Sequence, residues 1–440
     1  MTLNMGFLLT NHLCSKYYLC MKYLHRYIEK EIELALDSSG VVVVEGPKFC
    51  GKTTTSKIYS KSSYSLDTKQ KIELVQSNPE AILSGETPRL IDEWQNVPDL
   101  WNYARTEVDN RESKFGQFIF TGSSTPAEKD EIYHSGAGRI VKIKMKPMSL
   151  SETAESKGLV SLSDLFNGLD ELFFLNENYN LNNTAFFICR GGWPLSLTDD
   201  RDRALRITRN YCSTLFSFEN SKNKKFRNKK PELFKMIMRS YARNVSTEAR
   251  RTKMLADINK HEDRNLSEET FDDYLEALRD LYIIADLDAW NPNFRSKTAV
   301  ITSPTRHFVD TSLAAYSLNI SPDDLLNDPE TFGLFFEDFA VKELSIYTQF
   351  LGGEIRHYRD SNGLECDAVI HLENGEYCLI EIKLGGEALI EDGCSTLHAL
   401  KRKILAEGRK APAFLMVLTA VGDAFIKDDV FIVPINMIKA

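Results

Sequence analysis

The spacing of apolar residues in the first third of the chain predicts alternating strands and helices. Leu24, Ile28 and Ile32 recur at intervals of three or four residues, so we expect a helix over 21–36. Val41–Val44 is a β-branched run bounded by glycines, as in a strand buried on both faces of a parallel sheet. Strand-like and helical stretches then alternate to about residue 147. This pattern is typical of an α/β layer structure.

The remaining pattern predicts a mostly helical middle and an α+β end. We expect helices at 233–244, 253–260, 268–281, 332–350 and 396–407, an extended segment at 283–290, and strands at 364–372, 377–384, 413–418 and 430–434. The expected domains are an N-terminal extension (1–20), an α/β domain (21–150), a helical connector (151–220), a middle domain (221–320) and an α+β domain (321–440).

The first two strands expected in the C-terminal domain both carry apolar residues at even positions. If one face of this hairpin is buried, even positions must lie opposite even positions, so the loop holds an odd number of residues or a bulge intervenes. A two-residue Asn374-Gly375 turn would instead pair odd with even positions. The favoured register places Asp367, Glu381 and Lys383 on one face.

Composition excludes several classes of protein. The chain has 440 residues and a net charge of −9, and its 42% hydrophobic and 27% charged residues are typical of a folded globular protein. No window of about 18 uncharged apolar residues occurs, and the apolar segment 5–20 is interrupted by polar residues. We therefore expect neither a membrane span nor a good signal peptide, and Met21 is an alternative start to Met1. Because the eight cysteines include no C-x-x-C pair, we expect reduced thiols and a cytoplasmic location.

A phosphate-binding loop follows the first expected strand. Residues 46–53 read GPKFCGKT and match G-x-x-x-x-G-K-[ST] at each fixed position, and the preceding strand argues against a chance match. Backbone N–H groups of such a loop converge on phosphate at the positive end of the next helix. Lys52 would neutralise the β- and γ-phosphates of ATP, and the Thr53 hydroxyl would ligate Mg²⁺. The residues predicted to contact the nucleotide are Gly46, Pro47, Lys48, Phe49, Cys50, Gly51, Lys52, Thr53, Thr54, Thr121 and Ser123.

Three further segments carry residues suited to nucleotide hydrolysis. Asp92 ends a short apolar strand, where it would support Mg²⁺, and Glu93 would orient and deprotonate the attacking water. Thr121 and Ser123 end another strand and would contact the γ-phosphate or this water, unless they only form a turn. Arg139 would stabilise charge in the transition state, within one subunit or across an interface, unless it is an ordinary surface arginine.

The motifs of this chain resemble those of a known family. In order, they read GPKFCGKT, LIDEW, FIFTGSS, SGAGRI, KPMSLSE, RGGWP, FGLFFEDFAVKEL, GLECDAVI and LIEIKLG. They are similar to AAA-type ATPases of bacteria and archaea that join a P-loop domain to a C-terminal domain of unknown function. The resemblance implies an AAA-like parallel sheet, ATP with Mg²⁺ as cofactors and a winged-helix-like middle domain. It implies no particular physiological substrate.

The C-terminal carboxylates resemble the PD-(D/E)XK nuclease signature, with Asp367 as its Asp and Glu381-Ile382-Lys383 as its ExK. This resemblance implies a restriction-endonuclease-like α+β fold. Asp367 and Glu381 would hold Mg²⁺ against a phosphodiester, Lys383 would position water, and Glu337 of the preceding helix would approach them. The alternative is a half-exposed strand face with a Glu381–Lys383 ion pair, on a scaffold that only binds.

The middle of the chain is basic, whereas the chain as a whole has a net negative charge. Residues 220–264 hold fourteen Lys or Arg against five Asp or Glu. Ser267 would cap the third helix of a winged-helix-like module, but that helix carries five carboxylates, which would repel DNA. DNA contact is therefore expected through the basic stretch 222–253, and a solvated linker is the alternative. The candidate residues are Lys222, Lys224, Lys225, Arg227, Lys229, Lys230, Arg250 and Arg251.

These patterns together predict a cytoplasmic, Mg²⁺-dependent ATPase that acts as a molecular switch and is coupled to DNA binding or cleavage. The alternative is a signalling or scaffold ATPase whose C-terminal domain only binds a protein partner. No membrane association is expected, and an oligomer is compatible with the sequence.

Overall fold

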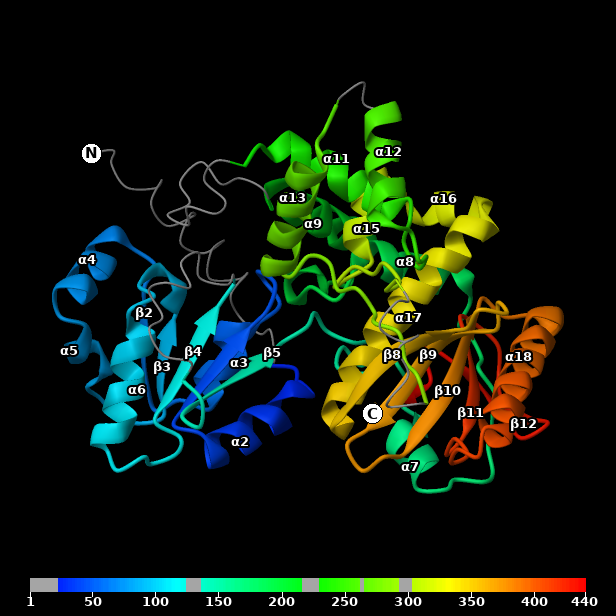
Figure 1. Ribbon diagram of the computed structural model, residues 1–440, viewed down its shortest axis with the longest axis horizontal. Helices are drawn as coiled ribbons and strands as arrows, with labels where there is room; N and C mark the ends of the chain where they lie inside the picture. Colours follow the sequence, from blue (N-terminus) through cyan, green and yellow to red (C-terminus); the bar gives the residue numbers. More distant parts are fainter. Residues whose placement is uncertain (1–22, 124–135, 216–228, 262–264, 293–302) are drawn as a thin grey trace, which may run out of the picture.

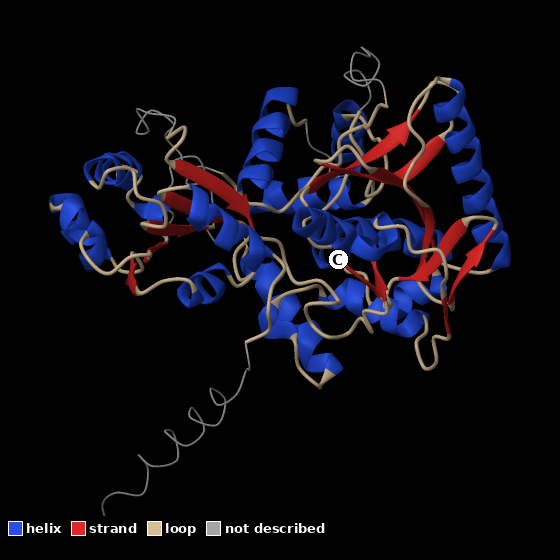
Figure 2. Ribbon diagram, turned by 90° about the horizontal axis from the view of Figure 1, so that it is seen from below, coloured by secondary structure: helices blue, strands red, loops and turns tan. Residues whose placement is uncertain are grey.

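The computed structural model describes residues 23–123, 136–215, 229–261, 265–292 and 303–440. Two sheets lie at opposite ends of the molecule and are separated by helices, as both ribbon views show (Figures 1 and 2). The long helix α17 (Pro329–Leu351) lies between them. None of the helices in these ranges is both long and apolar enough to cross a bilayer. The six cysteines in the same ranges are free thiols.

The N-terminal unit is built on a five-stranded parallel sheet with the order β2-β3-β4-β1-β5. Its strands are β1 (Val41–Glu45), β2 (Ser62–Ser65), β3 (Arg89–Asp92), β4 (Phe118–Gly122) and β5 (Ile140–Lys144). Its helices are α2 (Ile28–Ser38), α3 (Lys52–Ile58), α4 (Lys69–Ser77), α5 (Pro79–Leu83) and α6 (Leu100–Asn110). Parallel sheets need both faces covered. Val42 and Val44 accordingly share a core with α2, and Val41 and Val43 share one with α6, which confirms the predicted α/β layers.

The middle of the chain is helical, as predicted. Its helices are α8 (Leu181–Arg190), α9 (Arg201–Thr214), α11 (Pro231–Ala242), α12 (Arg251–His261), α13 (Glu268–Asp280), α15 (Ser312–Leu318) and α16 (Pro322–Asn327). The predicted cap of α13 is present, because the Ser267 side chain accepts a hydrogen bond from the Thr270 N–H at 3.2 Å. The segment after α13 forms isolated antiparallel bridges, Ile284 with Phe308 and Leu287 with Thr305.

The C-terminal unit is built on a seven-stranded mixed sheet with the order β7-β12-β13-β11-β10-β9-β8, in which β7 is Phe173–Phe174. Its elements are β8 (Gly353–Arg359), β9 (Glu365–Leu372), β10 (Tyr377–Lys383), α18 (Glu387–Ala406), β11 (Leu415–Thr419), β12 (Ala424–Lys427) and β13 (Val430–Pro434). Helix α17 and helix α18 cover opposite faces, since Ile380 shares a core with Phe335 and Leu379 shares one with Leu397.

The hairpin register is the one predicted. Cys378 lies opposite Ile370, and His371 lies opposite Tyr377, leaving residues 372–376, an odd number, between them. Even positions therefore face even positions. The continuation of this register places Asp367 and Glu381 side by side at the end of the hairpin.

Several elements differ from the prediction. Helix α18 begins nine residues before the expected start, because Gly393 interrupts its apolar spacing, and β8 has too many charged residues to stand out as a strand. Strands β6 (Val160–Ser161) and β7 (Phe173–Phe174) lie in the expected helical connector. They pair with β14 (Ile438–Lys439) and β12, so distant segments of the chain define them and local sequence does not.

Candidate functional site

The phosphate loop connects β1 to α3 and depends on glycines. Gly46 has φ 153°, and a Cβ there would lie 2.2 Å from the Met145 carbonyl oxygen. Gly51 has φ 104°, in the left-handed region that glycine adopts without strain. The side chain of Lys52 is 7% exposed and folds back along the loop, where Nζ donates to the carbonyls of Gly46 at 2.9 Å and Pro47 at 2.7 Å. Two carbonyl groups of the loop thus bind the ammonium group of Lys52.

The carboxyl ends of neighbouring parallel strands meet beside this loop. Asp92 ends β3 opposite Thr121 of β4. One oxygen of Asp92, Oδ1, accepts hydrogen bonds from the hydroxyls of Thr53 at 2.8 Å and Thr121 at 2.5 Å. The structure therefore brings Thr53, Asp92 and Thr121 together, with Ser123 buried just beyond β4 and Thr54 exposed on α3. Hydroxyl and carboxylate oxygens suit Mg²⁺, and these donors fit a magnesium ion shared with a bound triphosphate.

Glu93 directly follows β3 and has a left-handed backbone conformation. Its φ and ψ are 56° and 41°, which is uncommon for a residue with a Cβ. This turn directs the chain into a short 3₁₀ helix, Trp94–Asn96. The Glu93 carboxylate accepts a hydrogen bond from the side-chain amide of Gln95.

Arg139 is not near the phosphate loop. Its carbonyl accepts a hydrogen bond from the N–H of Val41, at the start of β1, whereas the loop follows the end of β1. Its guanidinium donates to Asp109 of α6 at 2.9 Å. The structure thus does not place Arg139 by the nucleotide of its own chain, and a role across a subunit interface stays a prediction.

The predicted carboxylates of the C-terminal unit do come together. Nζ of Lys383 lies 2.6 Å from Glu381 and 3.6 Å from Asp367, and the other partner of Asp367 is the N–H of Ile382 at 2.7 Å. Oε1 of Glu381 is buried and has no hydrogen-bond partner among the described residues. Helix α17 packs against β9 and β10, and the charges of Asp367, Lys383 and Glu381 act on the pKa of its Glu337.

The electrostatics of this cluster oppose full ionisation. Burial and the neighbouring Asp367 raise the pKa of Glu381 to about 8, although Lys383 acts in the opposite direction. Burial, with Asp367 adding to it, also raises the pKa of Glu337 well above its usual value. Burial disfavours the charge on Lys383, but Asp367 and Glu381 outweigh it and raise the pKa of this lysine. The cluster would accept a further positive charge readily.

A divalent cation suits the chemistry of these donors, although the cluster is not arranged as a metal site. In the part of the chain that the structure describes, no group of three or more His, Cys, Asp or Glu side chains is placed so as to hold a metal ion. Lys383 contacts the two carboxylates instead. Oε1 of Glu381 and the carboxylate of Asp367, which is 18% exposed, would ligate a cation.

Comparison with known proteins decides the class of the N-terminal unit. Residues 38–154 match the family model described as "AAA domain". These residues form an AAA-type P-loop ATPase domain. Two further models match later parts of the chain, "Domain of unknown function (DUF8612)" at residues 182–324 and "Domain of unknown function (DUF4143)" at residues 332–438. The winged-helix-like and nuclease-like parts therefore stay predictions.

The relatives that match most of the chain are distant. An uncharacterized protein of Mycobacterium tuberculosis is 23% identical over 81% of this chain and 74% of its own length. An uncharacterized protein of Methanocaldococcus jannaschii is 27% identical over 65% of this chain and 58% of its own length. Among solved structures, the Walker-type ATPase of Pyrococcus abyssi is 13% identical, with 67% of this chain and 96% of that chain covered at a TM-score of 0.41.

The basic stretch lies only partly within the described residues. Lys222, Lys224, Lys225 and Arg227 lie outside them. Lys229 is buried and paired with Asp273 of α13, and Arg251 forms an ion pair with Asp272 at 3.2 Å. Lys230 and Arg250 are exposed. Two of the carboxylates on α13 that were expected to repel DNA are therefore partly neutralised by the basic stretch itself.

Four residues that were not predicted as site residues also act on the two sites. The Arg26 guanidinium and the Glu152 carboxylate lie behind the phosphate loop of the AAA domain, and Tyr282 donates to Glu45, the last residue of β1, at 2.8 Å. Asp392 of α18 acts on Glu381 and Lys383. These residues come from distant segments, and only Glu152, the last residue of the KPMSLSE motif, carried a signal in the local sequence.

Proposed function

We propose that this protein is a Mg²⁺-dependent ATPase that works as a nucleotide-driven switch. The observation that carries the proposal is the shared oxygen of Asp92, which holds the Thr53 and Thr121 hydroxyls at the mouth of a glycine-dependent phosphate loop. A carboxylate placed there supports a metal ion on a triphosphate.

The residues of the AAA domain divide the chemistry among them. Backbone N–H groups of the loop would bind the phosphates, and Lys52 would leave its carbonyl partners to neutralise the terminal phosphates. Thr53 would ligate Mg²⁺ and Asp92 would support it, and the ion would neutralise charge on the phosphates when bound. Glu93 would orient the attacking water and take its proton. Loss of the γ-phosphate would then release the contacts that bound ATP makes with the loop.

Steady-state ATP hydrolysis by the purified chain tests this proposal. We expect turnover in the presence of Mg²⁺ and loss of nucleotide binding in Lys52→Ala. Lys57→Ala is the matched control, because Lys57 is exposed on the same helix. If Lys52→Ala binds ATP as tightly as the wild type, the phosphate-loop assignment is wrong.

We propose as a second activity that the C-terminal unit cleaves DNA with a divalent cation. The convergence of Glu337, Asp367, Glu381 and Lys383 supports it, since carboxylates and a lysine can hold a metal against a phosphodiester and activate water. Exposed basic residues of the middle domain would contact DNA backbone phosphates. Such contact would weaken steeply with salt.

Incubation with plasmid DNA and Mg²⁺ or Mn²⁺, with and without ATP, tests the second activity. We expect nicking by the wild type, no nicking by Lys383→Ala and unchanged nicking by Lys427→Ala. Lys427 is a partly exposed lysine paired with Glu391 on the same domain. Absence of nicking by the wild type, with ATP hydrolysis intact, would instead favour a signalling or scaffold switch. In that case the C-terminal domain binds a protein partner or further copies of this chain.

A further inference from the structure

A buried arginine contacts the phosphate loop from behind. Arg26 precedes α2 and is 7% exposed. Its Nη1 donates to the Cys50 carbonyl at 2.8 Å, its Nη2 to the Lys146 carbonyl at 2.7 Å, and its Nε to Glu152 at 3.1 Å. The guanidinium therefore joins the loop to the segment that follows β5. A planar guanidinium fixes several acceptors at once, whereas an ammonium acts as a point charge.

The contact with Cys50 determines the direction of one N–H group in the loop. In a trans peptide the C=O and the N–H point to opposite sides. When Arg26 holds the Cys50 carbonyl, the Gly51 N–H must point away from Arg26. Gly51 has φ 104° and, without a Cβ, gives this peptide little rotational restraint of its own. An external partner is needed to keep it in one orientation.

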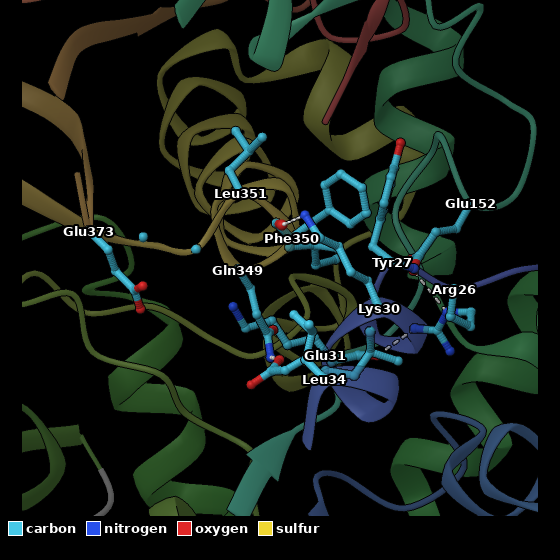
Figure 3. Close-up of a pocket in the computed structure, with 15 residues that line it drawn as sticks. Arg26, Tyr27, Lys30, Glu31, Leu34, Glu152, Gln349, Phe350, Leu351 and Glu373 are labelled. Carbon is cyan, nitrogen blue, oxygen red and sulfur yellow. Dashed lines mark hydrogen bonds and ion pairs between the residues drawn. The ribbon is translucent and has the colours of Figure 1, made fainter. Parts of the chain in front are cut away.

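Glu152 holds the arginine in place. Its Oε1 accepts from Arg26 Nε and from the Tyr27 N–H at 2.8 Å, and its Oε2 accepts from the Ser149 N–H at 2.8 Å. Figure 3 shows the pair at the side of a cavity of about 320 Å³ between α2 and the end of α17. With both carboxylate oxygens bonded, Glu152 has little freedom to move.

We propose that Arg26 is a positioning residue of the phosphate loop, oriented by Glu152, and that it turns the Gly51 N–H toward the phosphates of a bound nucleotide. The inference rests on the proposed ATPase function and names residues for it outside the loop motif. Arg26 acts through the backbone and touches no nucleotide itself. A purely structural role, in which the pair only joins two segments, would change stability and leave the affinity of the folded protein for nucleotide unchanged.

Arg26→Lys is the decisive variant. It keeps the charge, so the buried Glu152 stays compensated, but it cannot hold three acceptors in one plane. We expect the Kd for a fluorescent ATP analogue and for ADP, and the KM for ATP, to rise on the order of tenfold, as the loss of one charge-assisted hydrogen bond implies. We expect kcat to change little, because an interaction lost equally from ground and transition states acts on KM.

A double variant and a control variant distinguish a positioning role of Arg26 from a purely structural one. Arg26→Met with Glu152→Leu removes both charges at similar volume, which leaves no unpaired buried ion. We expect it to fold and to bind nucleotide as weakly as Arg26→Lys. Arg306→Lys is the matched control, because Arg306 is buried and contacts a carbonyl and a carboxylate in the middle domain. We expect its Kd to equal that of the wild type.

Two outcomes distinguish this inference from the proposed function. If Arg26→Lys is folded by thermal unfolding and binds ATP and ADP with wild-type Kd, the positioning role is overturned while the ATPase stands. If the wild type binds no nucleotide, the proposed function fails first, and the positioning role falls with it.

Discussion

Residues in and beside the phosphate loop already have hydrogen-bond partners in the absence of nucleotide. Lys52 is bonded to two carbonyls of its own loop, and one oxygen of Asp92 serves two hydroxyls. Glu93 differs, because it sits in a left-handed turn with the Gln95 amide as the hydrogen-bond partner of its carboxylate. Residues held in such sparsely populated conformations cluster at functional sites. A substitution of Glu93 is therefore expected to slow ATP hydrolysis without weakening ATP binding.

Glu93→Gln should bind ATP and hydrolyse it slowly. Glutamine keeps the size and can accept the same hydrogen bond, but it cannot take a proton from water. We expect kcat to fall by about 10²-fold or more with little change in the Kd for ATP, as typical of the loss of a general base. Single-turnover hydrolysis and fluorescent-analogue binding measure the two quantities. An unchanged rate would mean that another group activates the water.

Elements with a strong local pattern were predictable, and elements defined by distant partners were not. The run Val41–Val44 and the even-position pattern of the C-terminal hairpin indicated β1 and the register that brings Asp367 to Glu381. Strands β6 and β7 have two residues each and exist only because β14 and β12 lie beside them. Arg26 was missed for the same reason, since its acceptor Glu152 is 126 positions away.

The edge strand β8 carries a titratable group that should make stability depend on pH. His357 is 3% exposed. Its backbone N–H donates to the Asp288 carbonyl at 3.0 Å, and its backbone carbonyl accepts from the Trp290 N–H at 2.6 Å. Burial lowers the pKa of His357 to about 4, and the neighbouring His307 adds to this effect. Glu248 lies beside it, with Oε1 3.8 Å from Nδ1 of the ring.

Acidification should therefore destabilise the folded chain through His357. The folded pKa is below the unfolded value of about 6.5, so the unfolded state binds the proton first. Stability is complete above about pH 6.5 and is lost as the pH falls toward 4, by about 2 kcal/mol between pH 7 and pH 5. Urea unfolding at both pH values should show this loss in the wild type and a smaller loss in His357→Gln. Equal losses in the two proteins would contradict the shift.

At the scale of the whole molecule, the AAA domain is tied to the rest of the chain by several contacts around its phosphate loop. Tyr282 bonds Glu45, and Phe49, although 60% exposed, packs its ring 5.5 Å from that of Tyr211. Helix α2 packs against α17. The same helix α17 carries Glu337. The two candidate sites are thus joined through packed elements, α2 and α17.

Nucleotide should for this reason stabilise both sheets together. A ligand at 100 times its Kd adds about 2.7 kcal/mol to the free energy of unfolding of whatever unit it binds. We expect hydrogen exchange to slow in β11 and β13 as well as in β1 and β4 when ATP and Mg²⁺ are added to Glu93→Gln. Protection confined to the N-terminal sheet would show that the two units unfold independently.

The pairing of β7 with β12 has a consequence for synthesis on the ribosome. Next to β7, the N–H of Asn176 bonds to the Asp423 carboxylate, 247 residues later in the chain. At roughly 5–20 residues per second, the first of these segments waits on the order of 12 to 50 s for its partner to be translated. During that interval Phe173 and Phe174 lack the strand that they pair with. The nascent chain therefore exposes an unpaired, aggregation-prone strand edge, which chaperones are suited to shield.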